Sequence, residues 1–393
     1  MDFISDELER FKGRGLLRGL RLLEGEQSSR VRIDGRDVIL LSSNNYLGLA
    51  SHPKVKERAI DAIKRYGCGA GASRLISGNM ELHEELEKRI AEFKNTEAAL
   101  IFNSGYTANI GVIAALCNKC DIVISDRLNH ASIIDGSMIS RAKTKRYPHK
   151  DIYALERALS SSSDYRRRLI VTDGIFSMDG DIAPLPDIVR LAERYSAFLM
   201  VDDAHATGVL GEGGRGTGEY FGIEEGIDIQ MGTLGKAIGG FGAYIAGEKR
   251  LIDLLINKCR SFIYTTGLPP SVLASSLAAL DILEEDGHDM RRRLWRNARY
   301  LRDGLIRLGF NTMGSETQII PVLIGDSATT VKISEMLFEE GIYVQGIRPP
   351  TVPEGSSRLR ITPMATHSID DLSNALEAFE KVARCYRFSE NPI

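Results

Sequence analysis

Short apolar segments with strand character alternate with segments of helical character through the first three quarters of this chain. Strands are predicted at 98–102, 121–125, 169–172, 198–201 and 227–231, and helices at 53–66, 79–94, 108–116, 132–141 and 184–195. Such alternation is typical of a mostly parallel sheet covered by helices on both faces. Ligands of these sheets bind beyond the carboxyl ends of the strands. The sequence therefore predicts an α/β fold whose functional site lies at one edge of the sheet.

The two ends of the chain do not follow this alternation. An amphipathic helix is predicted at 5–23, followed by short strands at 31–33 and 38–41. Helices at 269–285 and 287–308 precede a region, 317–386, that alternates strand, helix, strand, strand and helix. We therefore expect an N-terminal segment at 1–45, a large domain at 46–310 and a small α/β domain at 311–393.

Composition narrows the function classes. The chain of 393 residues is longer than a domain with a single compact core, so it suggests two associated domains. Its content of 43% hydrophobic and 26% charged residues is ordinary for a globular protein. A net charge of −3 argues against nucleic-acid binding. No apolar segment is long enough to span a bilayer, and the charged N-terminus lacks the apolar core of a secretory signal.

Cysteine usage is sparse. The five cysteines are scattered, which favours reduced thiols and a cytoplasmic setting. Cys117 and Cys120 form a C-x-x-C pair, but no second pair or histidine follows at metal-ligand spacing. We predict no metal site.

Two motifs carry the strongest chemical signal. The glycine-rich segment GTLGKAIGG places Lys236 among small and apolar residues, where a purely solubilising lysine is unexpected. About thirty residues earlier, VDDAHATG ends an apolar run with Asp202, Asp203 and His205. A lysine amine, a carboxylate and a further polar group are the functions that pyridoxal phosphate chemistry requires. The residues therefore predict a pyridoxal 5'-phosphate site.

Plainer interpretations exist for each of these residues. Lysines are mostly solvated surface charges. Asp202 could cap a strand end, and His205 could be a core histidine with satisfied hydrogen bonds.

Other glycine-rich motifs fit their usual functions poorly. GEGGRG at 211–216 matches the dinucleotide-binding pattern, but the residues that follow it are a poor helix start. The alternative hypothesis of a nicotinamide oxidoreductase depends on this motif alone. Gly235 and Lys236 do not form a P-loop, because Gln230 and Ala237 stand where glycine and Ser/Thr are needed.

The chain resembles the α-oxoamine synthases, a family of fold-type-I pyridoxal phosphate enzymes, from about residue 5 to residue 385. The motifs that carry the resemblance are SSNNYLGL (42–49), SGYTAN (104–109), DRLNHAS (126–132), GIFSMDGD (174–181), VDDAHATG (201–208), GTLGK (232–236), IYTTGLPP (263–270) and IRPPTVPEGSSRLRIT (347–362). The resemblance implies a large domain with a mostly parallel seven-stranded sheet and a smaller C-terminal α/β domain.

The resemblance also assigns cofactor roles. It implies that Lys236 forms the Schiff base, that Asp202 pairs with the pyridinium nitrogen and that His205 reaches the phenolic oxygen. His130 would stack on the ring. Ser177 and Thr233 are implied as further cofactor contacts. The backbone amides of Gly105 and Tyr106 would meet the phosphate at a helix start. Thr265 and Thr266 would reach the phosphate from a partner subunit. The resemblance therefore also implies a homodimer with shared active sites.

Substrate contacts are implied in the same way. Arg360, helped by Asn44, would hold the alanine carboxylate, since a guanidinium fork matches a carboxylate. The alternative for Arg360 is a surface strand arginine. Arg18 would meet the far carboxylate of a pimeloyl chain, and its alternative is an exposed helix charge. Thr351 is implied as a further substrate contact.

Within the family, IRPPTVP and SGYTAN favour the branch that joins L-alanine to a pimeloyl thioester, carried by coenzyme A or acyl carrier protein, in biotin biosynthesis. Carbon dioxide and the free thiol would be released. The alternatives are a family member that uses glycine, serine or another acyl group, and an inactive regulatory subunit of the same fold, which the presence of Lys236 disfavours.

Overall fold

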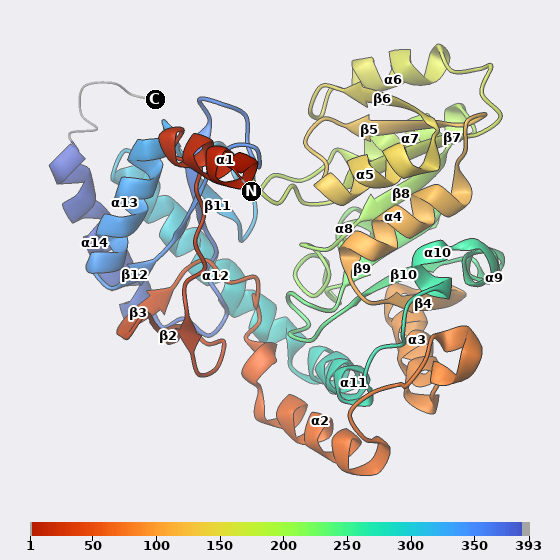
Figure 1. Ribbon diagram of the computed structural model, residues 1–393, viewed down its shortest axis with the longest axis horizontal. Helices are drawn as coiled ribbons and strands as arrows, with labels where there is room; N and C mark the ends of the chain where they lie inside the picture. The colour runs from red at the N-terminus through yellow and green to blue at the C-terminus, as the bar shows by residue number, and fades with distance from the viewer. Residues whose placement is uncertain (1, 387–393) are drawn as a thin grey trace. The chain divides into compact units, whose positions relative to one another are not determined.

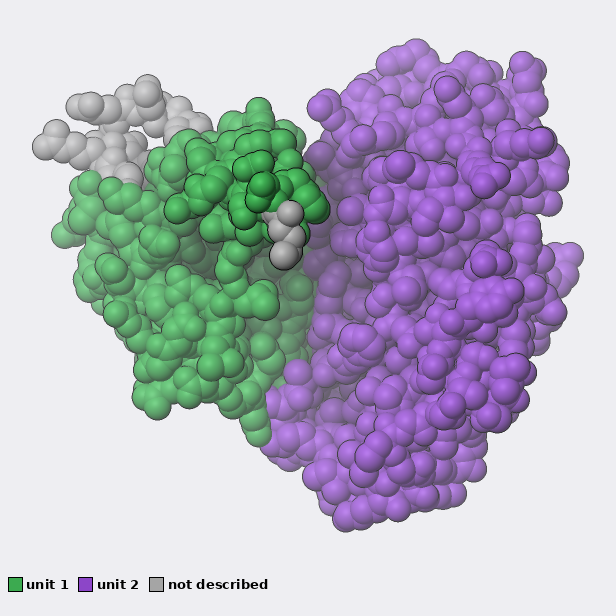
Figure 2. Space-filling model, viewed as in Figure 1, with its two compact units in different colours: residues 1–48, 178–181, 292–393 green, residues 49–177, 182–291 purple. Residues whose placement is uncertain are grey.

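The computed structural model describes residues 2–386, which form two compact units (Figure 2). The large unit comprises residues 49–177 and 182–291. The small unit comprises the described residues up to 48, residues 178–181 and those from 292 onwards. No helix in the described range has the length and apolar character needed to cross a membrane.

The large unit is built on one seven-stranded sheet with the order β4-β10-β9-β8-β7-β5-β6 (Figure 1). Strand β10 runs antiparallel to both its neighbours, β4 and β9, and the other neighbouring pairs of this sheet are parallel. The strands are β4 (Ala98–Phe102), β5 (Ile122–Asp126), β6 (Lys143–Tyr147), β7 (Arg168–Asp173), β8 (Phe198–Asp202), β9 (Ile229–Thr233) and β10 (Ala243–Gly247). The predicted fold class, with a mostly parallel seven-stranded sheet, is confirmed.

Helices surround this sheet in the large unit. They are α2 (Pro53–Tyr66), α3 (Glu81–Lys94), α4 (Gly105–Leu116), α5 (Ala131–Ser140), α6 (Ile152–Ser160), α7 (Leu185–Arg194), α8 (Thr217–Phe221), α9 (Lys249–Lys258), α10 (Arg260–Ile263) and α11 (Pro270–Glu285). The boundary between the units falls within α12 (Gly287–Arg307).

Both faces of the sheet are buried. Because successive side chains of a strand point to opposite faces, neighbouring residues join different cores. In β7, Leu169 and Val171 join a core with α4, α9 and α10, whereas Ile170 joins a second core with α6 and α7. Each fully buried side chain of this size contributes roughly 1.5–3 kcal/mol to folding. The strands are therefore fixed from both sides, and their carboxyl ends form a rigid edge.

The small unit contains two sheets, with the strand orders β1-β2-β3-β12 and β11-β14-β13. Its elements are α1 (Asp2–Gly13), β1 (Leu23–Glu24), β2 (Arg30–Ile33), β3 (Arg36–Leu40), β11 (Ile320–Gly325), α13 (Ser327–Glu339), β12 (Ile342–Tyr343), β13 (Gln345–Ile347), β14 (Ser357–Ile361) and α14 (Ile369–Tyr386).

The unit boundaries differ from the predicted domains 1–45, 46–310 and 311–393. Strand β3 pairs in parallel with β12, which joins the N-terminal segment to the C-terminal region. Ile39 shares a core with Leu301 and Leu305 of α12 and with residues of α14. These long-range contacts place the start of the chain and most of α12 in the small unit.

The predicted helix at 5–23 is too long. Helix α1 ends at Gly13, and Gly15 has a φ of +64°, which permits a glycine-type helix stop. The Leu16 N–H then bonds back to the Phe11 carbonyl oxygen at 2.8 Å. The segment from Arg14 to Leu22 is not helical.

Candidate active site

Lys236 lies in a tight loop between the neighbouring strands β9 and β10. The Leu234 N–H donates to the Gly242 carbonyl at 2.9 Å, and the Gly240 N–H donates to the Leu234 carbonyl at 2.8 Å. Gly239 has a φ of +72°, and a side chain there would clash with the backbone of residues 49 and 50. The loop needs glycine for this conformation and close approach, and it presents the lysine at the carboxyl edge of the sheet.

A cavity of about 190 Å³ opens at this edge, and Lys236 lines it. The carboxyl ends of β7, β8 and β9 supply residues to its wall, and so do the segments that follow β4 and β5. The predicted residues in the wall are Gly105, Tyr106, His130, Ser177, Asp202, His205, Thr233 and Lys236. Residues from five separate sequence motifs are thus brought together, as expected for a parallel sheet.

Lys236 and His205 are in direct contact. The Lys236 Nζ lies 2.9 Å from His205 Nε2. His205 is buried, and it follows the end of β8 by three residues. The amine therefore projects over the sheet edge toward the cavity rather than into solvent.

Asp202 is held by two donors at the end of β8. Its Oδ2 accepts from Asn109 Nδ2 at 2.7 Å, and its Oδ1 accepts from the Ala204 N–H at 2.9 Å. The side chain is only 5% exposed. A carboxylate with two aligned donors at a cavity wall is fixed in orientation and suited to a cationic partner.

A hydrogen-bonded chain links Asp202 to His130. Asn109 Nδ2 also donates to Ser132 Oγ at 2.9 Å, and Ser132 Oγ lies 2.7 Å from His130 Nδ1. Sequence reasoning did not identify Asn109 and Ser132. Asn109 carried a signal, since it is the only polar side chain in the predicted helix 108–116.

His130 is favoured in its neutral form. Although the ring opens onto the cavity, loss of solvation by the surrounding protein lowers its pKa, and the Lys236 charge lowers it further, whereas Asp202 opposes the shift. A neutral imidazole with one face open can stack on an aromatic ring.

The start of α4 lines the cavity and is suited to bind an anion. Ser104 caps the helix by accepting from the Thr107 N–H at 3.2 Å. The Gly105 and Tyr106 amides lie in the first turn, where backbone N–H groups lack partners within the helix. A side chain at Gly105 would place its Cβ 2.8 Å from the Met231 side chain. Tyr106 is exposed, and its hydroxyl bonds to Asp135.

The residues of this cavity fit pyridoxal phosphate. They supply an amine, a fixed carboxylate, a neutral imidazole and a helix N-terminus for a phosphate. Thr233 Oγ1 donates to the Gly242 carbonyl at 2.9 Å, so this hydroxyl also shapes the lysine loop.

Thr265 and Thr266 do not line this cavity. They lie beside a separate, much smaller cavity with Arg74, His83 and Ser261. Thr266 is exposed and forms an isolated bridge with Ser73.

The predicted carboxylate-binding residues cluster in the small unit. Arg360, on β14, is 6% exposed and donates to Asn44 Oδ1 at 3.1 Å and to the Tyr46 hydroxyl at 3.4 Å. The alternative of a surface arginine is therefore wrong. Arg358, two residues away, instead pairs with Asp179 at 2.7 Å. Burial raises the pKa of Tyr46, so this hydroxyl stays neutral.

Arg18 and Thr351 lie at the segment that follows β13 in the small unit. Arg18 is exposed and donates to the Pro349 carbonyl at 3.0 Å. Thr351 is exposed, and its N–H donates to the Arg348 carbonyl at 3.2 Å. Arg18 lies beyond the end of α1, so it is not a helix charge.

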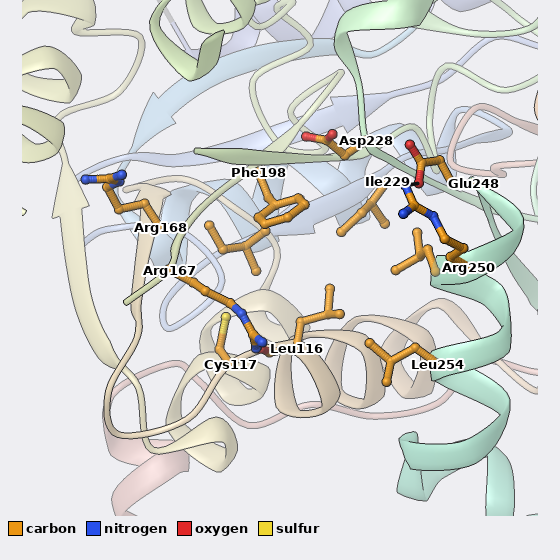
Figure 3. A pocket seen from close by; sticks show the side chains of 12 residues that line it. Leu116, Cys117, Arg167, Arg168, Phe198, Asp228, Ile229, Glu248, Arg250 and Leu254 are labelled. Atoms are coloured by element: carbon orange, nitrogen blue, oxygen red, sulfur yellow. Dashed lines mark hydrogen bonds and ion pairs between the residues drawn. The ribbon is translucent and has the colours of Figure 1, made fainter. Parts of the chain in front are cut away.

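A larger cavity lies at the opposite edge of the sheet (Figure 3). It has a volume of about 420 Å³ and lies at the amino ends of β7, β8 and β9. Figure 3 shows Phe198 between Ile229 and Arg167 in its wall. None of the predicted site residues contributes to it, so size alone does not identify the functional cavity.

Comparisons with known proteins agree with this geometry. The family model "Aminotransferase class I and II" matches residues 36–379. The chain belongs to the aminotransferase class I and II family. It has the fold-type-I fold of these enzymes, and its cofactor is pyridoxal phosphate.

Two kinds of family member are especially similar. An 8-amino-7-oxononanoate synthase from Geotalea daltonii is 58% identical over 386 residues, covering 98% of each chain. The solved 8-amino-7-oxononanoate synthase from Francisella tularensis has a TM-score of 0.77 and 30% identity, and covers 89% of this chain and 99% of its own. A serine palmitoyltransferase from S. paucimobilis, solved with bound pyridoxal phosphate and myriocin, has a TM-score of 0.93 and 33% identity, and covers 98% of this chain and 97% of its own.

Proposed function

We propose that this enzyme condenses L-alanine with a pimeloyl thioester to give 8-amino-7-oxononanoate, carbon dioxide and the free thiol, in biotin biosynthesis. The observation that carries the proposal is the 58% identity to an 8-amino-7-oxononanoate synthase along nearly the whole of both chains. The serine palmitoyltransferase from S. paucimobilis matches the backbone with a TM-score of 0.93, but it is only 33% identical in sequence.

The cavity residues have distinct roles in this reaction. When bound, pyridoxal phosphate supplies an electron sink for the charge left at the amino-acid Cα. Lys236 tethers the cofactor and then moves the Cα proton, and its contact with His205 keeps the amine at the sheet edge. Asp202, fixed by Asn109, keeps the sink cationic.

Other residues bind the charged groups of the ligands. The α4 amides of Gly105 and Tyr106 meet the phosphate, and neutral His130 stacks on the ring. Ser177, Thr233 and His205 complete the cofactor contacts. Arg360, with Asn44 beside it, binds the alanine carboxylate, because a planar guanidinium fork matches a carboxylate.

The assembly and the acyl contacts are part of the same proposal. We assign Thr265 and Thr266 to the cofactor phosphate of a partner subunit, in a homodimer with shared sites. Their position away from the Lys236 cavity supports this assignment. Arg18 and Thr351 are assigned to the pimeloyl chain, and the acyl carrier is coenzyme A or acyl carrier protein.

The experiment is a substrate matrix with the purified holoenzyme. Alanine, glycine and serine are each combined with pimeloyl-CoA, acetyl-CoA and palmitoyl-CoA, and free thiol release is measured. The proposal predicts release only, or at least tenfold faster, with alanine and pimeloyl-CoA. Preference for serine with palmitoyl-CoA, or for glycine with acetyl-CoA, would assign another family activity.

A further inference from the structure

Asp173 is a buried carboxyl group in the cavity wall that has no role in the function above. It is the last residue of β7 and stands opposite Asp202 in the parallel pairing of β7 and β8. Its side chain is 3% exposed, and it lines the cavity together with Asp202 and Lys236. Two carboxyl groups therefore end neighbouring strands at one edge.

The hydrogen bonds of the two carboxyl groups differ. Asp173 Oδ2 accepts one bond, from the His130 backbone N–H at 3.2 Å. Its Oδ1 is fully buried and has no hydrogen-bond partner among residues 2–386. Asp202, in contrast, has a donor on each oxygen. Burying an ionised carboxylate with one oxygen that lacks a hydrogen-bond donor costs much free energy, whereas burying a neutral carboxylic acid costs less.

The surrounding charges act in the same direction. Burial, followed by the charge of Asp202, raises the pKa of Asp173 well above its usual range, and Asp126 adds to this rise. Lys236 and the His130 N–H oppose it without cancelling it. Two adjacent carboxyl groups cannot both ionise cheaply, so the negative charge is favoured on the member that has a donor for each oxygen.

We propose that Asp173 is a positioning residue of the cofactor cavity, a protonated carboxylic acid that anchors the His130 backbone and leaves Asp202 as the charged carboxyl of the pair. It acts through these two neighbours. The proposal rests on the cofactor assignment of the cavity, but not on the identity of the amino acid or the thioester.

Asparagine is the matched replacement for this group. Asp173→Asn keeps an acceptor for the His130 N–H and cannot ionise, so it imitates the neutral acid. Asp173→Ala removes the acceptor. Asp126→Asn serves as the control, because each oxygen of Asp126 accepts from a backbone N–H group, of Leu128 at 2.8 Å and of Lys150 at 2.9 Å.

The first readout is unfolding by urea between pH 5 and 9. A carboxyl group whose pKa is raised by folding stabilises the protein fully below the unfolded pKa, near 3.9, and this contribution is lost as the pH rises through the folded pKa. Asp173→Asn should therefore gain in urea midpoint over the wild type as the pH increases. Asp126→Asn should be less stable than the wild type throughout. The proposal would be overturned if the urea midpoint of Asp173→Asn relative to the wild type fell as the pH increased, or if the Asp173→Asn protein did not fold.

The second readout is pyridoxal phosphate binding, measured by titration of cofactor-free protein. Asp173→Asn should bind with a dissociation constant within about threefold of the wild type, and Asp173→Ala more weakly. Asp202→Asn should weaken binding at least about tenfold, the factor that corresponds to losing 1.4 kcal/mol. Equal losses for Asp173→Asn and Asp202→Asn would mean that both groups are charged.

The third readout is the infrared difference spectrum of the holoenzyme, wild type minus Asp173→Asn, at pH 8. A protonated carboxyl stretch in the wild type is the expected result, and carboxylate bands alone would contradict it. Because none of the three readouts uses a substrate, an enzyme with a different amino-acid or acyl preference would refute the proposed function while leaving this inference intact.

Discussion

At the residue scale, hydrogen bonds orient the reactive groups of the site. Asp202 is oriented by Asn109 and the Ala204 N–H, and Lys236 by its contact with His205. Each of these contacts is close to the optimal hydrogen-bond length, and Asn109, Asp202 and His205 are buried. Replacing one group should therefore affect chemistry more than folding.

The first prediction concerns Asp202→Asn. The amide cannot hold a cationic partner, so turnover should fall by roughly 10²–10⁴-fold, the range for a lost proton-transfer or electrostatic group. Binding of alanine should change much less. Steady-state rates and the spectral dissociation constant for alanine check this, and a loss confined to alanine affinity would contradict the assigned role.

The second prediction concerns Arg360→Lys. Lysine keeps the charge but loses the planar fork, so the KM for alanine should rise by about 10–100-fold while kcat changes less. Arg358→Lys is the control, because Arg358 pairs with Asp179. Unchanged KM in the Arg360 variant would remove it from the alanine site.

At the element scale, strands that are buried on both faces determine the geometry of the cavity, and most of these strands could be predicted from the sequence. Apolar runs predicted β4, β5, β7, β8 and β9, and the motifs after them predicted the cavity residues. Two strands of the large unit's sheet were missed, the edge strand β6, whose sequence KTKRY carries no apolar run, and β10, whose sequence AYIAG is apolar. The partners Asn109, Ser132 and Tyr46 were missed because their contacts join segments far apart in sequence. The start of the chain pairs with β12, a long-range contact that no local pattern encodes.

The third prediction concerns the turn before α14. His367 is 2% exposed, and its Nδ1 accepts from the Met364 N–H at 2.8 Å, which requires a neutral ring. Burial lowers the pKa of His367 to about 4. The unfolded histidine, with a pKa near 6.5, takes up the proton first, so stability falls with acidification by about 2 kcal/mol between pH 7 and pH 5.

Urea unfolding of the wild type and of His367→Gln checks this expectation. The glutamine variant should lack this part of the pH dependence, although it is less stable at pH 7. Identical slopes for the two proteins would show that His367 does not titrate in this range.

At the scale of the whole molecule, the proposed homodimer makes a prediction of its own. Subunits with Lys236→Ala and subunits with Thr265→Ala and Thr266→Ala are each expected to be inactive or nearly so. In hybrids, one site combines the intact lysine of one subunit with the intact threonines of the other. Random mixing should restore about a quarter of wild-type activity, because half of the dimers carry one intact site. No recovery, despite hybrid formation, would mean that the sites are not shared.

The central claim is that the cofactor is tethered to Lys236. The most direct measurement is borohydride reduction of the holoenzyme, followed by proteolysis and mass spectrometry of the peptides, with Lys236→Ala as the control. The account predicts one pyridoxyl adduct, on the peptide that contains Lys236, and none in the variant. An adduct on a different lysine, or no adduct in the wild type, would contradict it.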